Sequence, residues 1–231
     1  GGESNRPGSM PVGADEERRR VIPVIRLLAP RLDIPVSVDT YKYGVAREAL
    51  AAGAAMINDV WGLKQDPALA ALAAREGVPI VLMHNQKGTN YADLVPEVLA
   101  SLRTSLAQAL ESGVPSENVI LDPGLGFGKE AEHNLEVLRR LEEFKALNLP
   151  ILVGTSRKST IGLVLDLPVE ERLEGTAATV ALAIANGADI VRVHDVKTMT
   201  RVARMSDAIV RGWAAPMHAP SAGSGQALHP Q

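Results

Sequence analysis

Polar side chains that could bind a ligand follow each of six short apolar runs in the sequence. The runs are rich in Val, Ile and Leu and span residues 34–38, 55–57, 78–83, 119–121, 151–153 and 190–193. The polar residues that end them or follow them include Asp39, Asn58, His84, Asp122, Lys158, Arg192 and His194. A single Asp after a strand is most often the N-cap of the next helix. Six polar ends in succession instead predict one cleft, lined by Asp39, Asn58, Asp122, Lys158, Arg192 and His194.

Arg192 and His194 are the pair best suited to an anionic group. They lie two positions apart in the last apolar run, so in a strand their side chains would share one face. A guanidinium can bind two anion oxygens and an imidazole can donate a further hydrogen bond. The alternative is a structural ion pair between Arg192 and Asp195.

Two loops could complete such a cleft. Residues 155–159 read Thr-Ser-Arg-Lys-Ser, a basic and hydroxyl-rich turn that could hold an acidic ligand. Residues 122–129 read Asp-Pro-Gly-Leu-Gly-Phe-Gly-Lys. This loop is not a Walker loop, because Pro123 takes the position of the leading Gly and Glu130 that of the Ser or Thr after the Lys. Its glycines allow close approach of the backbone to a flat ligand.

Composition excludes several other classes of site. The chain has no Cys, which rules out disulfides, thiolate metal sites and a cysteine nucleophile. His84 has no partner at metal-ligand spacing, and no G-x-S-x-G elbow is present. A net charge of −3 and 3% aromatic residues give no basis for a nucleic-acid surface. No apolar run reaches the roughly 18–20 residues that span a bilayer.

The apolar runs alternate with helical stretches over residues 42–52, 67–76, 92–112, 132–147, 169–186 and 197–211, after an earlier helix over 14–29 that should bend at Pro23. Short continuous apolar runs are typical of strands buried on both faces of a parallel sheet. Strand–helix alternation then predicts either a closed (β/α)8 barrel or an open doubly wound sheet. Six pairs are visible where a barrel needs eight, so we expect residues 1–212 to form an N-terminally incomplete barrel domain and 213–231 a loose tail rich in Ala, Pro, Gly and Ser.

Seven segments together resemble, in order, the signatures of the dihydropteroate synthase family. They are GGESNRPG (1–8), SVDT (37–40), INDV (57–60), MH (83–84), DPGLGFGK (122–129), SRKS (156–159) and RVHD (192–195). The resemblance implies a TIM (β/α)8 barrel, here lacking its first strands. It also implies a transferase of folate biosynthesis, the target of sulfonamides, which joins 6-hydroxymethyl-7,8-dihydropterin diphosphate to 4-aminobenzoate and releases diphosphate. A homodimer, a cytoplasmic location and Mg2+ as cofactor are further expectations.

The resemblance also implies a role for particular residues. The pterin would be bound by Asp39, Asn58, Asp122, Lys158 and Arg192, the diphosphate by Asn5, Arg192 and His194, and the 4-aminobenzoate by Arg6, Pro7, Lys158 and Ser159. Asn5 stands where the family commonly has Thr. No residue would act covalently. The Asn that helps hold Mg2+ in the family is expected upstream of Gly1, so no metal ligand is predicted within these 231 residues.

The chemistry of these groups suits the implied reaction. A carboxylate such as Asp122 can accept from both the exocyclic amine and the ring N–H of a pterin, and Lys158 can donate to its ring carbonyl and a ring nitrogen. We expect a dissociative path in which diphosphate leaves first and the arylamine traps the resulting cation. Two alternatives stay open: a pterin-binding methyltransferase domain that holds methyltetrahydrofolate, and a non-catalytic relative that only binds pterin.

Overall fold

The computed structural model describes residues 1–4 and 10–213 of the chain, and these residues form alternating strands and helices. The strands are β1 (Ser37–Asp39), β2 (Met56–Asp59), β3 (Ile80–Met83), β4 (Val119–Asp122), β5 (Leu152–Val153) and β6 (Ile190–Val191). The α-helices are α1 (Ala14–Leu28), α2 (Tyr43–Ala51), α3 (Ala68–Glu76), α4 (Leu94–Glu111), α5 (Ala131–Arg139), α6 (Ser159–Leu165), α7 (Leu173–Ala185) and α8 (Val196–Val210). Short 3-10 helices are η1 (Ala29–Arg31), η2 (Ser116–Asn118), η3 (Leu141–Leu147) and η4 (Val169–Glu171).

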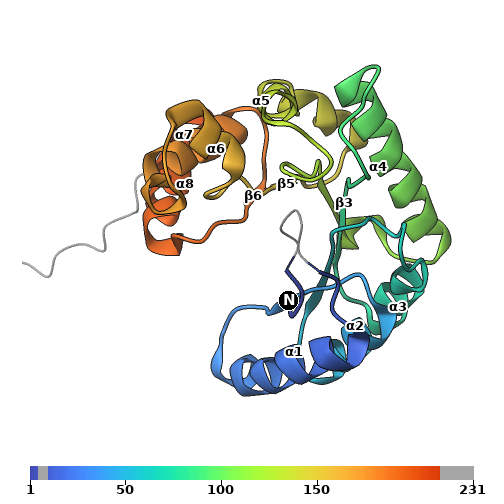
Figure 1. Cartoon of the computed structure of the whole chain (residues 1–231). Helices are drawn as coiled ribbons and strands as arrows, with labels where there is room; N and C mark the ends of the chain where they lie inside the picture. Colours follow the sequence, from blue (N-terminus) through green and yellow to red (C-terminus); the bar gives the residue numbers. More distant parts are fainter. Residues whose placement is uncertain (5–9, 214–231) are drawn as a thin grey trace, which may run out of the picture.

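The strands are parallel and follow one another in chain order. β1 pairs with β2, β2 with β3 and β3 with β4, a parallel bridge from Leu121 to Ile151 joins β4 to β5, and β5 pairs with β6. Figure 1 shows the helices outside these strands as an open ring, with α1 and α8 at its two ends. A doubly wound sheet reverses its strand order at a switch point. This order does not reverse, so the barrel prediction is confirmed and the open-sheet alternative is wrong.

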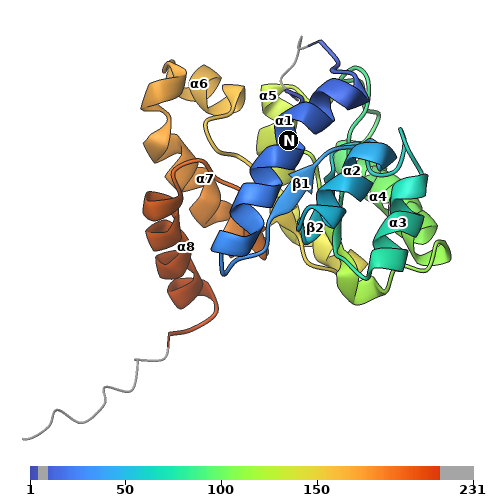
Figure 2. The same ribbon diagram turned by 90° about the horizontal axis from the view of Figure 1, so that it is seen from below.

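Apolar side chains pack on both faces of the strands. On the outer face, Ile80, Leu82 and Leu121 are buried against helix residues such as Leu102 and Phe144. On the inner face, three side chains from neighbouring strands form a separate buried cluster, Val81, Ile120 and Leu152. Residues that alternate between two buried faces explain why each run reads as continuously apolar. The last two helices, α7 and α8, pack side by side (Figure 2).

The structure corrects several predicted boundaries. The helix expected over 132–147 ends at Arg139 and continues as the 3-10 helix η3. Its apolar residues recur every third position, which is the period of a 3-10 helix and not the 3.6 of an α-helix. The helix expected over 169–186 begins as η4 and becomes α7 only at Leu173. Helix α6 falls in a segment for which no helix was predicted.

The strands are shorter or shifted relative to the apolar runs. β1 begins at Ser37 because Pro35 has no N–H for a ladder, and Ile34 is 69% exposed. β2 and β4 each extend to include the polar residue at their end, Asp59 and Asp122. β6 ends at Val191, so Arg192 and His194 lie in the loop after it and not within a strand.

Candidate active site

Strand alternation directs three predicted binding side chains to the inner face of the strands. Successive side chains of a strand point to opposite faces. Val38, Ile57 and Leu121 pack outward against helices. The residue that follows each of them, Asp39, Asn58 and Asp122, therefore points inward. All three therefore face the same interior at the carboxyl ends of their strands, which is where ligands bind in barrels of this class.

Register and an ion pair bring these ends together across the chain. Asp39 lies opposite Asn58 in the β1–β2 pair, and Asp122 lies opposite Met83 in the β3–β4 pair. From the other end of the chain, Nη2 of Arg192 lies 2.8 Å from Oδ2 of Asp39. Arg192 thus links the end of β6 to the end of β1, and the two residues are 153 positions apart in the sequence.

Asp122 is the buried carboxylate of the site, with 7% of its surface exposed. Burial raises the pKa of its carboxyl, and Lys158, the N–H of Gly124, Lys129 and Arg192 oppose this rise. The N–H of Gly124 donates to Oδ1 at 2.7 Å. A buried acceptor surrounded by cations can be ionised without water, and it suits a ligand that presents N–H donors.

The loop after β4 lies close against neighbouring backbone. Gly124 has a φ of +73°, and a Cβ there would lie 1.8 Å from the carbonyl oxygen of His84. Only Gly can occupy this position, which explains the residue type that the sequence presents after Asp122-Pro123. The N–H of Gly126 donates to Oδ1 of Asn134 at 2.7 Å, so α5 also fixes this loop.

Lys158 lies beside this loop, as the residue that precedes α6. Its Nζ donates to the carbonyl oxygen of Leu125 and lies 4.9 Å from the centre of the Phe127 ring. Burial lowers the pKa of Lys158 to about 8, although Asp122 raises it. Ser159 is the first residue of α6 and is exposed. The predicted basic turn therefore contributes a cation whose charge acts on Asp122.

Two neighbouring contacts join the loops after β5 and β6. Arg157 binds Asp195 through two hydrogen bonds, of 2.9 and 2.7 Å. Oγ of Ser156 accepts from the backbone N–H of His194 at 3.1 Å and lies 2.9 Å from its Nδ1. The predicted alternative of an Arg192–Asp195 ion pair is wrong, because Asp195 binds Arg157 and Arg192 binds Asp39.

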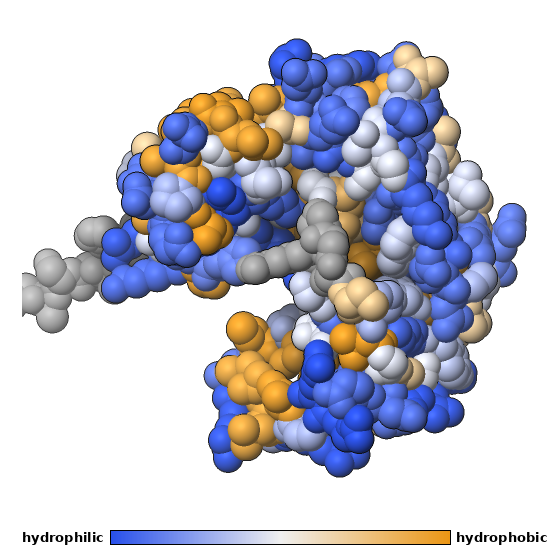
Figure 3. All heavy atoms as spheres, in the orientation of Figure 1, coloured by the Kyte–Doolittle hydropathy of each residue, from blue (hydrophilic) through white to orange (hydrophobic). Residues whose placement is uncertain are grey.

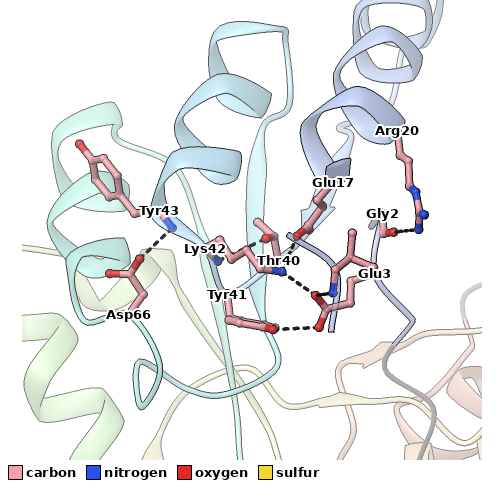
Figure 4. A network of polar contacts seen from close by, with 10 residues as sticks. Gly2, Glu3, Glu17, Arg20, Thr40, Tyr41, Lys42, Tyr43 and Asp66 are labelled. Carbon is pink, nitrogen blue, oxygen red and sulfur yellow. Dashed lines mark hydrogen bonds and ion pairs between the residues drawn. The ribbon is translucent and has the colours of Figure 1, made fainter. Parts of the chain in front are cut away.

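The N-terminal segment is fixed beside β1 by a polar network (Figure 4). The Glu3 carboxylate accepts from Tyr41 Oη, Lys42 Nζ and the backbone N–H of Val12, at 2.6–3.0 Å. Lys42 also binds the fully buried Glu17, at 2.7 Å. Glu3 therefore holds residues 3 and 12 against the loop that follows Asp39. The predicted site residues Asn5, Arg6 and Pro7 lie outside the described residues.

His84 and Lys129 form a buried pair that the sequence did not predict. Lys129 Nζ lies 2.8 Å from His84 Nδ1, and their exposed fractions are 8% and 2%. Burial lowers the pKa of His84 to about 3, helped by the charges of Lys129 and Lys64. Burial also lowers the pKa of Lys129 to about 7. The sequence offered one clue to a role for Lys129: it ends a glycine-rich loop but is not followed by the Ser or Thr of a phosphate-binding motif.

We expect His84 to make the protein less stable in acid. Its folded-state pKa of about 3 lies below the ordinary 6.5, so the unfolded chain binds more protons in that window and stability falls as the pH drops. Between pH 6.5 and 4.5 the loss should be about 2–3 kcal/mol, at about 1.4 kcal/mol per pH unit. Urea unfolding at both pH values, of the wild type and of a variant without His84, measures the His84 contribution as the difference between the two proteins. Asp59, whose pKa burial raises to about 6, acts in the opposite direction.

His84→Gln is the matched control for this acid effect, because Gln keeps an acceptor for Lys129 and does not titrate. Asp59 is unchanged in the variant, so the difference between the two proteins isolates His84. If wild type and His84→Gln lost the same free energy of unfolding between the two pH values, the assignment of a neutral buried His84 would be wrong.

Metal ligands are not clustered in the described part of the chain. Residues 1–4 and 10–213 hold no group of three or more His, Cys, Asp or Glu side chains that could bind a metal ion. In the same residues, no helix has the length and apolar character needed to cross a bilayer.

Comparisons with known proteins match the chain to one family over most of its length. The sequence profile described as "Pterin binding enzyme" matches residues 1–194. Dihydropteroate synthase of Bacillus subtilis is 56% identical over 210 residues, which are 91% of this chain and 74% of the relative. The Escherichia coli enzyme of the same name is 44% identical, over 90% of this chain and 76% of the relative.

Solved structures give the same result. Dihydropteroate synthase from Clostridium difficile, in the presence of pteroic acid, superimposes with a TM-score of 0.89 at 54% identity, over 91% of this chain and 81% of that one. The Xanthomonas albilineans enzyme with 4-aminobenzoic acid gives a TM-score of 0.87 at 41% identity, over 90% and 77%. These similarities favour a synthase over a methyltransferase domain.

Proposed function

Because this chain belongs to the dihydropteroate synthase family of pterin-binding enzymes, we propose that its strand-end residues carry out that family's reaction. A 6-hydroxymethyl-7,8-dihydropterin diphosphate would bind at the inner rim and react with 4-aminobenzoate, yielding 7,8-dihydropteroate and diphosphate. The observation that supports this most strongly is the convergence of Asp39, Asp122, Lys158 and Arg192 from four strand ends.

The pterin is expected to bind against Asp122. Its exocyclic amine and ring N–H would donate to the carboxylate, and Lys158 would donate to the ring carbonyl. Asn58 can both donate and accept at the ring edge, and Asp39 completes the acidic side. Arg192, 60% exposed at its side chain, would stack on the plane of the ring.

The diphosphate would bind at Arg192 and His194. The 2.9 Å contact between Ser156 Oγ and Nδ1 fixes the orientation of the imidazole. With the Ser156 hydroxyl donating to Nδ1, the ring proton lies on Nε2, which would donate to a phosphate oxygen. Asn5 is assigned to the same group by resemblance. These groups would stabilise negative charge that increases on the leaving group as the bond breaks.

Ser156→Ala should weaken binding of the diphosphate-bearing substrate selectively. The variant removes the acceptor for the His194 N–H and the partner of Nδ1, so the imidazole loses its orientation. We expect the KM for the pterin diphosphate to rise about 5–20-fold, on the scale of one or two hydrogen bonds. Affinity for 6-hydroxymethylpterin, which lacks the diphosphate, should stay within about twofold by calorimetry. An equal loss for both ligands would contradict this role of Ser156.

The reaction itself is proposed to be dissociative. The C–O bond to diphosphate breaks first and leaves a cationic pterin methylene, the arylamine nitrogen then forms the new C–N bond, and the amine releases one proton. No side chain forms a covalent bond, so the protein contributes position and charge. An oxygen label in the bridging position of the pterin diphosphate should scramble when the enzyme is incubated without 4-aminobenzoate, and this would support the order. No scrambling, with an enzyme sample that turns over once 4-aminobenzoate is added, would oppose it.

The 4-aminobenzoate is expected to be bordered by Arg6, Pro7, Lys158 and Ser159. Mg2+ is the expected cofactor of the reaction. The described residues do not form a site for it by themselves, so we derive no step through the metal and include it only in the assay.

A product assay separates synthase activity from simple pterin binding. The chain, Mg2+ and both substrates should yield dihydropteroate and diphosphate in equal amounts, and omission of 4-aminobenzoate should abolish dihydropteroate. Pterin binding without either product would identify a non-catalytic relative and overturn the proposal.

We also infer a homodimer and a cytoplasmic location. The dimer is supported by exposed apolar side chains on α6–α8, among them Leu163, Leu182 and Ile209 at 59–72% exposure, and by the apolar surface that Figure 3 shows over these helices. Sedimentation at micromolar concentration should give twice the mass of the chain, and a monomer would contradict it. The absence of Cys fits a reducing compartment.

A further inference from the structure

We propose that Lys129 is a positioning residue of the pterin site, which holds the loop after β4 and, through it, the carboxylate of Asp122 in the geometry that binds the pterin. The inference rests on the proposed function, because it assigns Asp122 to the pterin. It concerns a residue that touches neither substrate.

The Lys129 ammonium has a partner for each of its three protons. Nζ lies 2.8 Å from Nδ1 of His84, and it donates to the carbonyl oxygens of Gly124 and Phe127, each at 3.2 Å. The side chain is 8% exposed. A single cation thus ties both ends of the Gly124–Phe127 turn to the end of β3.

Two of these contacts lead directly to Asp122. Gly124 receives Lys129 at its carbonyl and donates its own N–H to Asp122 Oδ1 at 2.7 Å. His84 receives Lys129 at its ring and donates its backbone N–H to the Asp122 carbonyl at 2.9 Å. A shift of Lys129 would therefore move Asp122 at both its side chain and its backbone.

The cation is costly in this place, which argues against simple filling of space. An ammonium buried among carbonyl groups loses hydration that these contacts only partly replace, and burial accordingly lowers the pKa of Lys129 to about 7. Within the described residues no carboxylate lies within ion-pair distance of its Nζ. A methionine would fill the same volume without this cost. The carboxylate that benefits from the charge is Asp122, which in turn raises the Lys129 pKa.

The charged and titratable groups that face Lys129 come from every neighbouring element. Asp122 raises its pKa, and Lys158 and Lys64 lower it. His84 is neutral above a pKa of about 3, and the pKa of Tyr91, whose ring centre lies 6.0 Å away, is raised to about 12. Lys129, with a pKa of about 7, and Lys158, with a pKa of about 8, are therefore the two groups here that change charge near neutral pH.

Lys129→Met tests the inference, with 6-hydroxymethylpterin as the probe in calorimetry. At pH 6.5, where the ammonium is charged, the variant should bind the probe at least tenfold more weakly than wild type. At pH 9 the ratio of the two affinities should fall to within about threefold, because the wild type has then lost the charge too. Lys158 also titrates over this range, so the comparison uses the ratio of the two affinities at each pH and not the affinity of either protein alone.

The matched control is Lys64→Met. Lys64 is another lysine whose Nζ donates to a loop carbonyl, that of Asn85 at 2.7 Å. No hydrogen bond among the described residues joins it to Gly124 or His84, the two residues through which Lys129 is linked to Asp122. Its affinity for the probe should stay within about twofold of wild type. Lys129→Gln, whose amide NH2 keeps two N–H donors without the charge, is the second variant should Lys129→Met fail to fold. Its affinity loss should be smaller.

Three results would overturn the inference. They are wild-type affinity in both Lys129 variants, a loss that is the same at pH 6.5 and 9, and an equal loss in Lys64→Met. The result for Asp122→Asn distinguishes the two proposals. If that variant loses the probe and the Lys129 variants do not, only the role of Lys129 is wrong, and if it binds the probe normally, the proposed pterin site is wrong.

Discussion

Replacing Asp122 by Asn is expected to weaken pterin binding by about 100-fold or more. In the proposed complex the carboxylate would present two acceptors to two N–H donors of the pterin, whereas an amide presents one acceptor and one donor group. The variant therefore loses a charge-assisted bond and sets two donors against each other, at about 1.5–3 kcal/mol for each bond to a charged group. Calorimetry with 6-hydroxymethylpterin measures the change, and Asp122→Ala should abolish binding.

Asp59→Asn is the matched control for this experiment. Asp59 is a fully buried carboxylate at the end of β2, two strands away from Asp122. Its oxygens accept from the backbone N–H groups of Trp61 and Leu63 and face the loop after β2. Its replacement should lower the free energy of unfolding and leave pterin affinity within about threefold. Unchanged affinity in Asp122→Asn would remove Asp122 from the site.

Arg192→Gln is expected to lower kcat about 100-fold or more. In the proposed mechanism Arg192 would bind the diphosphate as negative charge increases on it, and loss of one such donor typically costs about 10²–10³ in rate. Steady-state kinetics of diphosphate release measure this effect. Arg192→Lys keeps the charge but loses the planar fork, so its kcat should lie between those of wild type and Arg192→Gln.

The interpretation depends on separating this chemical effect from loss of the Arg192–Asp39 ion pair. Asp39→Asn breaks the same 2.8 Å contact and keeps the guanidinium. If Asp39→Asn and Arg192→Gln lowered kcat equally while pterin affinity stayed normal in both, Arg192 would act through the ion pair and not on the leaving group.

The inner rim of the site could be predicted from sequence because strand geometry is local. Six short apolar runs of three to six residues indicated the strands. Because the carboxyl ends of parallel strands meet on one side of the sheet, the polar residues at these ends, Asp39, Asn58 and Asp122, were expected to lie together. Family signatures added their order. Element boundaries were less accurate where the local signal was ambiguous. An apolar period of three predicts an α-helix over residues 132–147, but the second half of this stretch is the 3-10 helix η3.

Contacts between distant segments could not be predicted in this way. The Arg192–Asp39 and Arg157–Asp195 pairs depend on how the loops after different strands meet, and no spacing in the sequence encodes that choice. The Lys129–His84 contact was missed for the same reason, since each residue alone fits a surface loop as well as a buried pair. Helix α6 was not predicted, because its seven residues come directly after the basic turn and show no clear helical period of apolar residues.

A crystal structure with 6-hydroxymethylpterin bound is the most direct test of the central claim, that side chains from separate strand ends meet around one flat heterocycle. We predict that the ring lies on the inner face of the strands, with both Asp122 oxygens about 2.7–3.0 Å from its exocyclic amine and ring nitrogen and with Lys158 at its carbonyl. A pterin bound elsewhere, with Asp122 still in contact only with Gly124 and its neighbouring cations, would contradict the account.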